Sequence, residues 1–268
     1  MLLDNSASIN DMMGRELLLP YAPKKIISLV PSLTELLYSL RIDERVVGIT
    51  KFCIRPKDWK VIKPSVGGTK KINLSIIDQL EPDLIIANKE ENSIQEIDTL
   101  SSKYPVWVSD INNFDDALYA IEAIGEITQS EKEAKRLLYQ IHKAWGEITP
   151  EKNSLKTCAY LIWKDPIMAV GKNTFIDDMI KKLHLKNSVN EDRYPEIGLN
   201  KLEEMNPDIL FLSSEPFPFN ENHLSFFAEA LPNSQIIIVD GEMFSWYGSR
   251  MKYAVNYFNK LLLEIHNK

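Results

Sequence analysis

Residues 126–149 read EITQSEKEAKRLLYQIHKAWGEIT, and the sequence on both sides is organised around this stretch. Its apolar residues recur at helical intervals, while polar and charged residues fill the positions between them. These apolar residues are Ala134, Leu137, Leu138, Ile141, Trp145 and Ile148. Thr128 and Ser130 are suitable capping residues, and Pro150 would end a helix. The pattern predicts one long helix over 126–149.

The sequences on the two sides of this predicted helix repeat at an offset of 125 positions. The aligned pairs are 74–80 with 199–205, Pro82-Asp83 with Pro207-Asp208, Leu84–Ala87 with Ile209–Leu212, and Glu90 with Glu215. Each copy is typical of a short amphipathic helix, a Pro-Asp turn, an apolar strand and an acidic loop. We infer two similar lobes, 12–125 and 150–268, joined by the helix over 126–149.

Other apolar runs extend this pattern through both lobes. They predict strands at 24–30, 46–49, 106–110, 157–163 and 236–240, and helices at 31–40, 113–125, 175–183 and 250–264. Pro31, Ser32 and Glu35 are typical of a capped helix start. Residues 1–10 are expected to be a frayed leader, followed by an edge strand at 15–20. Because strands alternate with helices, we predict an α/β fold in which each lobe is a mostly parallel sheet flanked by helices.

The overall composition limits the possible partners. The 268 residues are 44% hydrophobic, enough for two cores, and the net charge is −7. This acidic balance argues against nucleic acid as a partner, and we identify no cluster of Lys and Arg with interleaved aromatic residues. Cys53 in a loop and Cys158 in a strand are expected to be two free thiols.

The first residues bear on location. Residues 1–16 contain Asp4, Asp11, Arg15 and Glu16 and no apolar segment of a signal peptide. The sequence also contains no transmembrane run. From the sequence as written, we expect a cytoplasmic location.

The loops that follow the predicted strands are candidates for ligand contact, because ligands of parallel sheets bind beyond the carboxyl ends of the strands. These loops are rich in aromatic residues and glycine, as in many small-molecule sites. The candidate ligand-contacting residues are Phe52, Trp59, Gly68, Glu90, Trp163, Tyr194, Glu215, Phe244, Trp246, Tyr247 and Arg250. Several of the aromatic side chains are expected to pack in loop cores instead.

The predicted loop at 240–250, DGEMFSWYGSR, has an unusual composition for a connection. Trp246 and Tyr247 carry large flat faces that suit a planar ring system. Arg250 is placed to reach a carboxylate or phosphate of a ligand, or to pair with Asp240. We therefore expect this loop to contact the ligand.

Motifs of common enzyme classes are absent from the sequence. It contains no G-x-S-x-G, no Walker A loop and no G-x-G-x-x-G after a strand. The four histidines, His142, His184, His223 and His266, lack the spacing of a metal site. We therefore expect no enzymatic activity, no metal site and no cofactor.

Five segments together resemble the substrate-binding proteins of ABC importers for cobalamin and iron chelates. The segments are 24–35 (KKIISLVPSLTE), 46–48, 66–69, 80–87 and 240–250, and the likeness covers 12–262. The resemblance implies two lobes held by one rigid helix, with a corrinoid, haem or ferric siderophore bound in the interlobe cleft. It also implies that Phe52 and Gly68 contact the ligand from the first lobe. Residues near the implied second-lobe contacts are Trp163, Tyr194, Trp246 and Arg250.

Two departures from the resembled family concern transport. Family members are typically exported to the periplasm, and the cobalamin receptor docks on its permease through one glutamate per lobe. The aligned positions here are Ser75 and Asn200, which cannot form such charged pairs. The resemblance therefore implies a small-molecule ligand and leaves docking on an ABC permease open. A monomer is expected.

Three functional hypotheses remain open from the sequence. The first is a non-enzymatic binding protein, either a component of an ABC importer or a cytoplasmic relative that stores, delivers or senses its ligand. The second is an enzyme acting on a corrinoid or related cofactor, with Glu90, Glu91, Glu215 or Asp240 as acid or base. The third is a scaffold with an empty cleft. A carboxylate with a strongly raised pKa would favour the enzyme.

Overall fold

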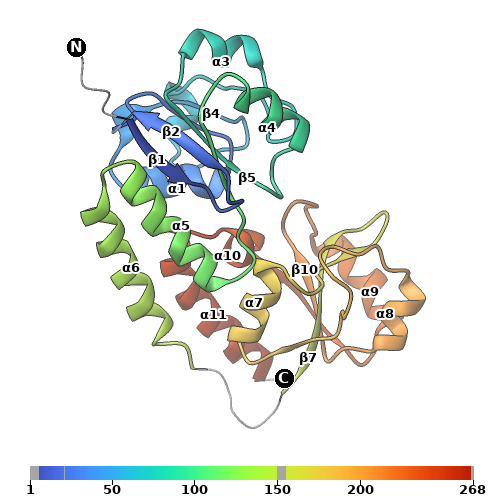
Figure 1. The fold of residues 1–268 in the computed structure, drawn as a ribbon. Helices are drawn as coiled ribbons and strands as arrows, with labels where there is room; N and C mark the ends of the chain where they lie inside the picture. The colour runs from blue at the N-terminus through green and yellow to red at the C-terminus, as the bar shows by residue number, and fades with distance from the viewer. Residues whose placement is uncertain (1–5, 21, 150–154, 267–268) are drawn as a thin grey trace, which may run out of the picture. The chain divides into compact units, whose positions relative to one another are not determined.

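The computed structural model describes residues 6–20, 22–149 and 155–266 (Figure 1). These residues form two compact units. Unit 1 comprises the chain up to Ile111, Asp115–His142 and Tyr247–Arg250, and unit 2 comprises Asn112–Phe114, Lys143–Trp246 and the chain from Met251. Residues 112–114 therefore belong to unit 2 although their neighbours in the chain belong to unit 1, and residues 247–250 belong to unit 1 although their neighbours belong to unit 2.

Unit 1 contains a four-stranded parallel sheet with the order β4-β3-β5-β6. The strands are β3 (Ile26–Ser28), β4 (Val46–Ile49), β5 (Leu84–Asn88) and β6 (Val106–Ser109). The helices are α1 (Pro31–Ser39), α2 (Trp59–Ile62), α3 (Leu74–Leu80), α4 (Ile94–Ser101) and α5 (Phe114–Ile127), and a 3₁₀ turn, η1 (Asp43–Arg45), precedes β4. Every residue of β5 is buried, as expected for an interior parallel strand.

Unit 2 contains a five-stranded sheet that is mostly parallel. Its path is β11-β10-β7-β8, with β9 also paired to β7, and only β8 runs antiparallel to its neighbour. The strands are β7 (Thr157–Trp163), β8 (Met168–Ala169), β9 (Lys186–Asn187), β10 (Ile209–Ser213) and β11 (Gln235–Val239). The helices are α7 (Phe175–Lys182), α8 (Leu199–Met205), η2 (Glu221–His223), α9 (Leu224–Ala230), α10 (Gly241–Ser245) and α11 (Met251–His266).

The repeat predicted from the sequence is confirmed element by element. Helix α3 and strand β5 of unit 1 have the same bounds as α8 and β10 of unit 2 once 125 is added to each residue number. Each helix ends at a left-handed residue, Glu81 with φ of 49° and Asn206 with φ of 38°. The two copies therefore share backbone conformation as well as apolar pattern.

The prediction of one continuous helix over 126–149 is wrong. Residues 126 and 127 end α5, and the next helix, α6, spans Glu131–Trp145. Gln129 has a left-handed backbone with φ of 52°, and the N–H of Ser130 donates to the Gly125 carbonyl at 2.7 Å, which ends α5. The predicted apolar stripe is confirmed where Ala134, Leu137 and Ile141 are buried. The division between the units falls within α6, between His142 and Lys143.

Two expectations for the start of the chain also need correction. Residues 6–10 are not frayed, since β1 (Ser6–Asn10) pairs antiparallel with β2 (Glu16–Pro20). Residues 1–5 lie outside the described part. Helix α1 begins at Pro31 as predicted, but no side chain caps it, so Ser32 and Glu35 do not form the expected capping pair. No helix of the described residues is long and apolar enough to cross a membrane.

Candidate functional site

The carboxyl ends of the unit 1 strands lead into loops that are bonded to one another. Asn88 ends β5, and its side-chain oxygen accepts the backbone N–H groups of Glu90 and Glu91. The Asn92 side chain accepts the N–H of Asn88 at 2.9 Å and donates to the carbonyl of Thr69 at 2.9 Å. The loop after β5 is therefore fixed to the glycine-containing segment at 66–69.

Phe52 and Gly68, both predicted ligand contacts, lie against each other in unit 1. The Phe52 side chain is 50% exposed, and the Lys51 ammonium lies 5.0 Å from its ring centre. A Cβ added to Gly68 would lie 3.1 Å from Phe52 Cε2, so a larger residue at position 68 would displace the Phe52 ring slightly. The N–H of Lys51 donates to the Gly67 carbonyl at 2.8 Å, which joins the two loops.

Trp59, in contrast, is a core residue. Its side chain is 1% exposed and packs edge-on against Tyr38, with ring centres 5.6 Å apart. The Lys63 ammonium lies 5.3 Å from the indole ring. The prediction that Trp59 contacts a ligand is therefore not supported, because the short helix α2 buries the indole.

Glu90 and Glu91 lie beside a lysine at the same end of the sheet. Lys70 donates to the main-chain carbonyl of Glu90. Loss of water around the Glu91 carboxyl raises its pKa, and the nearby Lys70 charge lowers it in part. Unit 1 thus holds one acidic group of raised pKa near the predicted site.

In unit 2, Trp163 lies at the carboxyl end of β7. It is 39% exposed, its indole N–H donates to the Asp165 carbonyl at 3.1 Å, and its ring meets Phe217 edge-on at 5.6 Å. Tyr194 is half-buried, with the Arg193 guanidinium 6.0 Å from its ring centre. Both predicted contacts therefore keep accessible ring surface.

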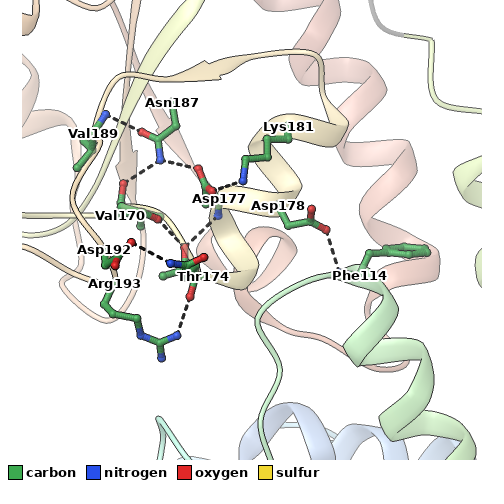
Figure 2. A network of polar contacts seen from close by, with 12 residues as sticks. Phe114, Val170, Thr174, Asp177, Asp178, Lys181, Asn187, Val189, Asp192 and Arg193 are labelled. Atoms are coloured by element: carbon green, nitrogen blue, oxygen red, sulfur yellow. Dashed lines mark hydrogen bonds and ion pairs between the residues drawn. The ribbon is translucent and has the colours of Figure 1, made fainter.

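A polar network at the start of α7 fixes the loops next to Tyr194 (Figure 2). Asp177 accepts from the Asn187 amide at 2.9 Å, and the same amide donates to the Val170 carbonyl at 3.0 Å. Arg193 donates to the carbonyl of Asn173 and to the side chain of Asn112, both at 2.6 Å. These bonds hold the backbone on both sides of the Tyr194 loop within unit 2.

Glu215 braces α10 instead of presenting a bare carboxylate. One of its oxygens accepts from the Ser245 hydroxyl at 2.8 Å and from the Trp246 indole N–H at 3.0 Å. A Cβ on Gly241 would lie 2.5 Å from Glu215 Cγ, so glycine is required for this close approach. Glu215 therefore orients the segment that carries Trp246.

The expectation that residues 240–250 form a loop with exposed aromatic faces is wrong. Residues 241–245 form α10, which the Asp240 side chain caps by accepting the Glu242 N–H at 3.0 Å. Phe244 is fully buried and its ring centre lies 4.8 Å from that of Phe258, while Trp246 and Tyr247 are each 7% exposed. The aromatic residues of this segment thus complete the core.

Arg250 has a protein partner that the sequence does not reveal. Its Nη2 and Nε donate to the two carboxylate oxygens of Glu35 at 2.7 and 3.0 Å, and the Arg250 side chain is 7% exposed. Glu35 is therefore a counter-ion of Arg250 that the sequence-based expectation did not include. The pair connects 247–250 to α1 within unit 1.

One feature of the sequence was missed. Residues 51–71 carry a single acidic residue, Asp58, and seven basic ones: Lys51, Arg55, Lys57, Lys60, Lys63, Lys70 and Lys71. Phe52 and Trp59 lie among them, so the statement that no such cluster exists is wrong. A local count of charge, in place of the net charge of the whole chain, reveals it.

The two cysteines are free, as predicted, and both are buried. Among the described residues, no group of three or more His, Cys, Asp or Glu is arranged to hold a metal ion.

Comparisons with known proteins agree with this architecture. A family model described as periplasmic binding protein matches residues 26–235. An ABC transporter substrate-binding lipoprotein of Bacillus subtilis, YvrC, is 28% identical over 215 residues, covering 76% of this chain and 68% of the relative. A vitamin B12-binding protein of Pectobacterium atrosepticum is 22% identical over 253 residues, covering 91% and 90%.

Solved structures show the same fold. The periplasmic vitamin B12 binding protein of Vibrio cholerae superposes with a TM-score of 0.74 at 20% identity, covering 93% of this chain and 100% of that one. A possible iron-binding periplasmic solute-binding protein from Staphylococcus epidermidis gives a TM-score of 0.75 at 25% identity, covering 91% and 99%. The predicted α/β fold of two lobes with mostly parallel sheets is confirmed. Because the family model matches most of the sequence, this chain belongs to the periplasmic binding protein family.

Proposed function

We propose that this chain is a solute receptor of the ABC-importer type that binds a metal chelate or a corrinoid. The observation that carries the proposal is the family match over residues 26–235. Relatives of similar sequence are named for binding vitamin B12 and, in Bacillus subtilis, Fe(3+)-citrate. A corrinoid is large enough to contact aromatic side chains over a wide surface, whereas ferric citrate presents mainly carboxylates.

The proposed contacts are the side chains that the structure leaves accessible at the carboxyl ends of the two sheets. In unit 1 they are Phe52 above Gly68, and in unit 2 they are Trp163 and Tyr194. Glu90 stays a candidate through its position beside Lys70. Glu215, Trp246, Tyr247 and Arg250 support these surfaces from within each unit, since their side chains are bonded or buried there.

The proposal is tested by titration of the purified chain with cyanocobalamin, haemin, ferric citrate and a ferric hydroxamate siderophore. Quenching of tryptophan fluorescence reports binding, because Trp163 is an exposed indole at the proposed surface. We expect saturable binding of at least one ligand, weakened in Phe52→Ala and Trp163→Ala. Absence of saturable binding across the four ligands would remove the proposal.

We also propose that binding is not followed by catalysis. The raised pKa of Glu91 favours an enzyme, but its main cause is loss of water around the carboxyl, and the described residues contain no group of His, Cys, Asp or Glu arranged to hold a metal ion. Ligand recovered after prolonged incubation and analysed by mass spectrometry should be unchanged. Conversion of the ligand that depends on Glu91 would establish the enzymatic alternative.

A permease is the proposed macromolecular partner. Ser75 and Asn200, which align with the docking positions of the resembled receptor, are exposed in the first turns of α3 and α8. Acidic residues lie one turn further on, at Asp78 in α3 and at Glu203 and Glu204 in α8. Fractionation of native cells and co-purification test this partner: recovery with a permease complex would support it, and a receptor that never co-purifies with a permease would contradict it.

A further inference from the structure

Unit 1 carries a concentrated positive charge on a chain that is acidic overall. Residues 51–71 combine seven basic residues with one acidic residue, whereas the whole chain has 31 Lys and Arg against 38 Asp and Glu. A local excess of this kind inside an acidic protein attracts an anionic partner to one region and leaves the remaining surface repulsive.

The basic loops occupy the carboxyl end of the unit 1 sheet. Lys51 stands two residues after the end of β4, and its N–H bonds to the carbonyl of Gly67. Lys70 bonds to the loop that follows β5 through the Glu90 carbonyl. Both lysines are exposed, and the edge they occupy is the one at which parallel sheets bind ligands.

The Lys51 ammonium is held over an exposed aromatic plane. It lies 5.0 Å from the centre of the Phe52 ring, which is itself 50% exposed and rests on Gly68. Such a pair offers a flat apolar surface and a positive charge side by side. A ligand with an organic skeleton and peripheral carboxylates matches both parts.

One acidic group at this edge is paired with a lysine. Asp110 pairs with Lys89 at 2.7 Å. Lys70 donates to the main-chain carbonyl of Glu90, which places a lysine beside Glu90 and Glu91. Within residues 51–71, seven basic residues outnumber the single acidic one, so the charge of the segment that carries Lys51 and Lys70 is positive.

We propose that Lys51, Phe52 and Lys70 form a subsite for the carboxylate groups of the ligand, so that the solute is a carboxylate-bearing iron compound and not an uncharged hydroxamate chelate or a corrinoid. This inference rests on the proposed function and narrows it to one ligand class. Ferric citrate and haem, through its propionates, share the required chemistry. Binding assays with each separate the two sources.

The test compares wild type with Lys51→Glu and with a matched control, Lys132→Glu. Lys132 is an exposed lysine of α6, so both variants change the net charge by the same amount. Each protein is titrated with ferric citrate, haemin, cyanocobalamin and a neutral ferric hydroxamate at low and high salt. Circular dichroism checks that each variant is folded.

We expect ferric citrate or haemin to bind wild type more tightly than the two uncharged ligands, and high salt to weaken that binding. Lys51→Glu should reduce the affinity roughly tenfold or more, because it removes the contact of the Lys51 ammonium with a ligand carboxylate and places a negative charge there instead. Lys132→Glu should change it little, and Lys51→Arg should retain most of it.

The possible failures point to different conclusions. Tight binding of cyanocobalamin or the hydroxamate, with no binding of either carboxylate ligand, would overturn this inference and leave the receptor function intact. Equal effects of Lys51→Glu and Lys132→Glu would also overturn it, since the charge would then act from anywhere on the surface. No binding of any ligand would overturn the receptor function itself.

Discussion

Asp83 and Asp208 perform the same structural task in the two units. One oxygen of Asp83 accepts the N–H groups of Lys24 and Lys25 at 2.7 and 3.0 Å, just before β3. One oxygen of Asp208 accepts the N–H and the hydroxyl of Thr157 at 2.6 and 2.7 Å, at the start of β7. The Pro-Asp turn of the repeat therefore fixes the beginning of an interior strand in each unit.

Replacement of either aspartate by asparagine should destabilise its unit. We expect Asp83→Asn and Asp208→Asn each to lower the free energy of unfolding by about 1 kcal/mol, which is below the usual range for hydrogen bonds to a charged group because both sites reach solvent. Urea denaturation measures the effect. Asp98→Asn on the exposed face of α4 is the control and should be near neutral.

The pH dependence of Asp208 provides a second readout. The hydroxyl and then the N–H of Thr157 lower the pKa of this carboxyl in the folded protein. A lowered folded pKa gives stability that is present above the unfolded pKa and is lost as the pH falls through the folded pKa. The stability difference between wild type and Asp208→Asn should therefore be full at neutral pH and shrink below about pH 4. A difference that stays constant on acidification would contradict this role.

The Arg250–Glu35 pair should contribute to stability. Arg250→Ala leaves a largely enclosed carboxylate without its guanidinium, and we expect a loss of about 3 kcal/mol in the free energy of unfolding. Arg250→Lys keeps the positive charge but not the bidentate hydrogen bonds to Glu35, so it should lower the free energy of unfolding by less. If Arg250→Ala weakened ligand binding without a change in the unfolding midpoint, the residue would be a ligand contact as first predicted.

Trp163 and Trp246 should respond differently to truncation. Trp163→Ala should leave the unfolding midpoint nearly unchanged and weaken ligand binding by about 1–3 kcal/mol, because its ring is exposed at the end of β7. Trp246→Ala should destabilise unit 2 by about 3 kcal/mol or more, because it empties a core position and removes the indole donor to Glu215. Thermal denaturation together with ligand titration separates the two effects.

The thiols of Cys53 and Cys158 should be inert in the native protein. Burial raises the pKa of both, so the reactive thiolate is scarce near neutral pH, and neither side chain is exposed. A thiol reagent such as DTNB should react slowly with native protein and rapidly with both cysteines in denaturant. Fast reaction of one thiol in the native state would show that its loop or strand opens.

The sequence predicts the repeated elements well because their signals are local. Periodicity sets α3 and α8, and proline with aspartate marks the turns that follow. The break between α5 and α6 was missed because no glycine or proline marks it, and a left-handed Gln129 is not expected from its residue type.

The candidate site is harder to predict because burial depends on distant residues. Phe244 and Trp246 have the composition of a ligand-binding loop, yet the neighbours that enclose Phe244 come from β7, β10 and α11. The resemblance predicts Phe52 and Gly68 as ligand contacts, and the structure places them against each other, which periodicity alone does not predict. Glu35 resembles a capping residue until the position of Arg250 is known.

Arg250 and Glu35 also have a consequence for the newly made chain. They stand 215 positions apart, yet both belong to the unit that leaves the ribosome first. The guanidinium partner of Glu35 does not exist until nearly all of unit 2 has been translated. Domains generally fold in the order of their synthesis. Here, unit 1 is synthesised first, but its residues 247–250 are synthesised after most of unit 2. A nascent chain interrupted before residue 250 therefore presents cellular proteases with two unfinished units instead of one finished receptor half.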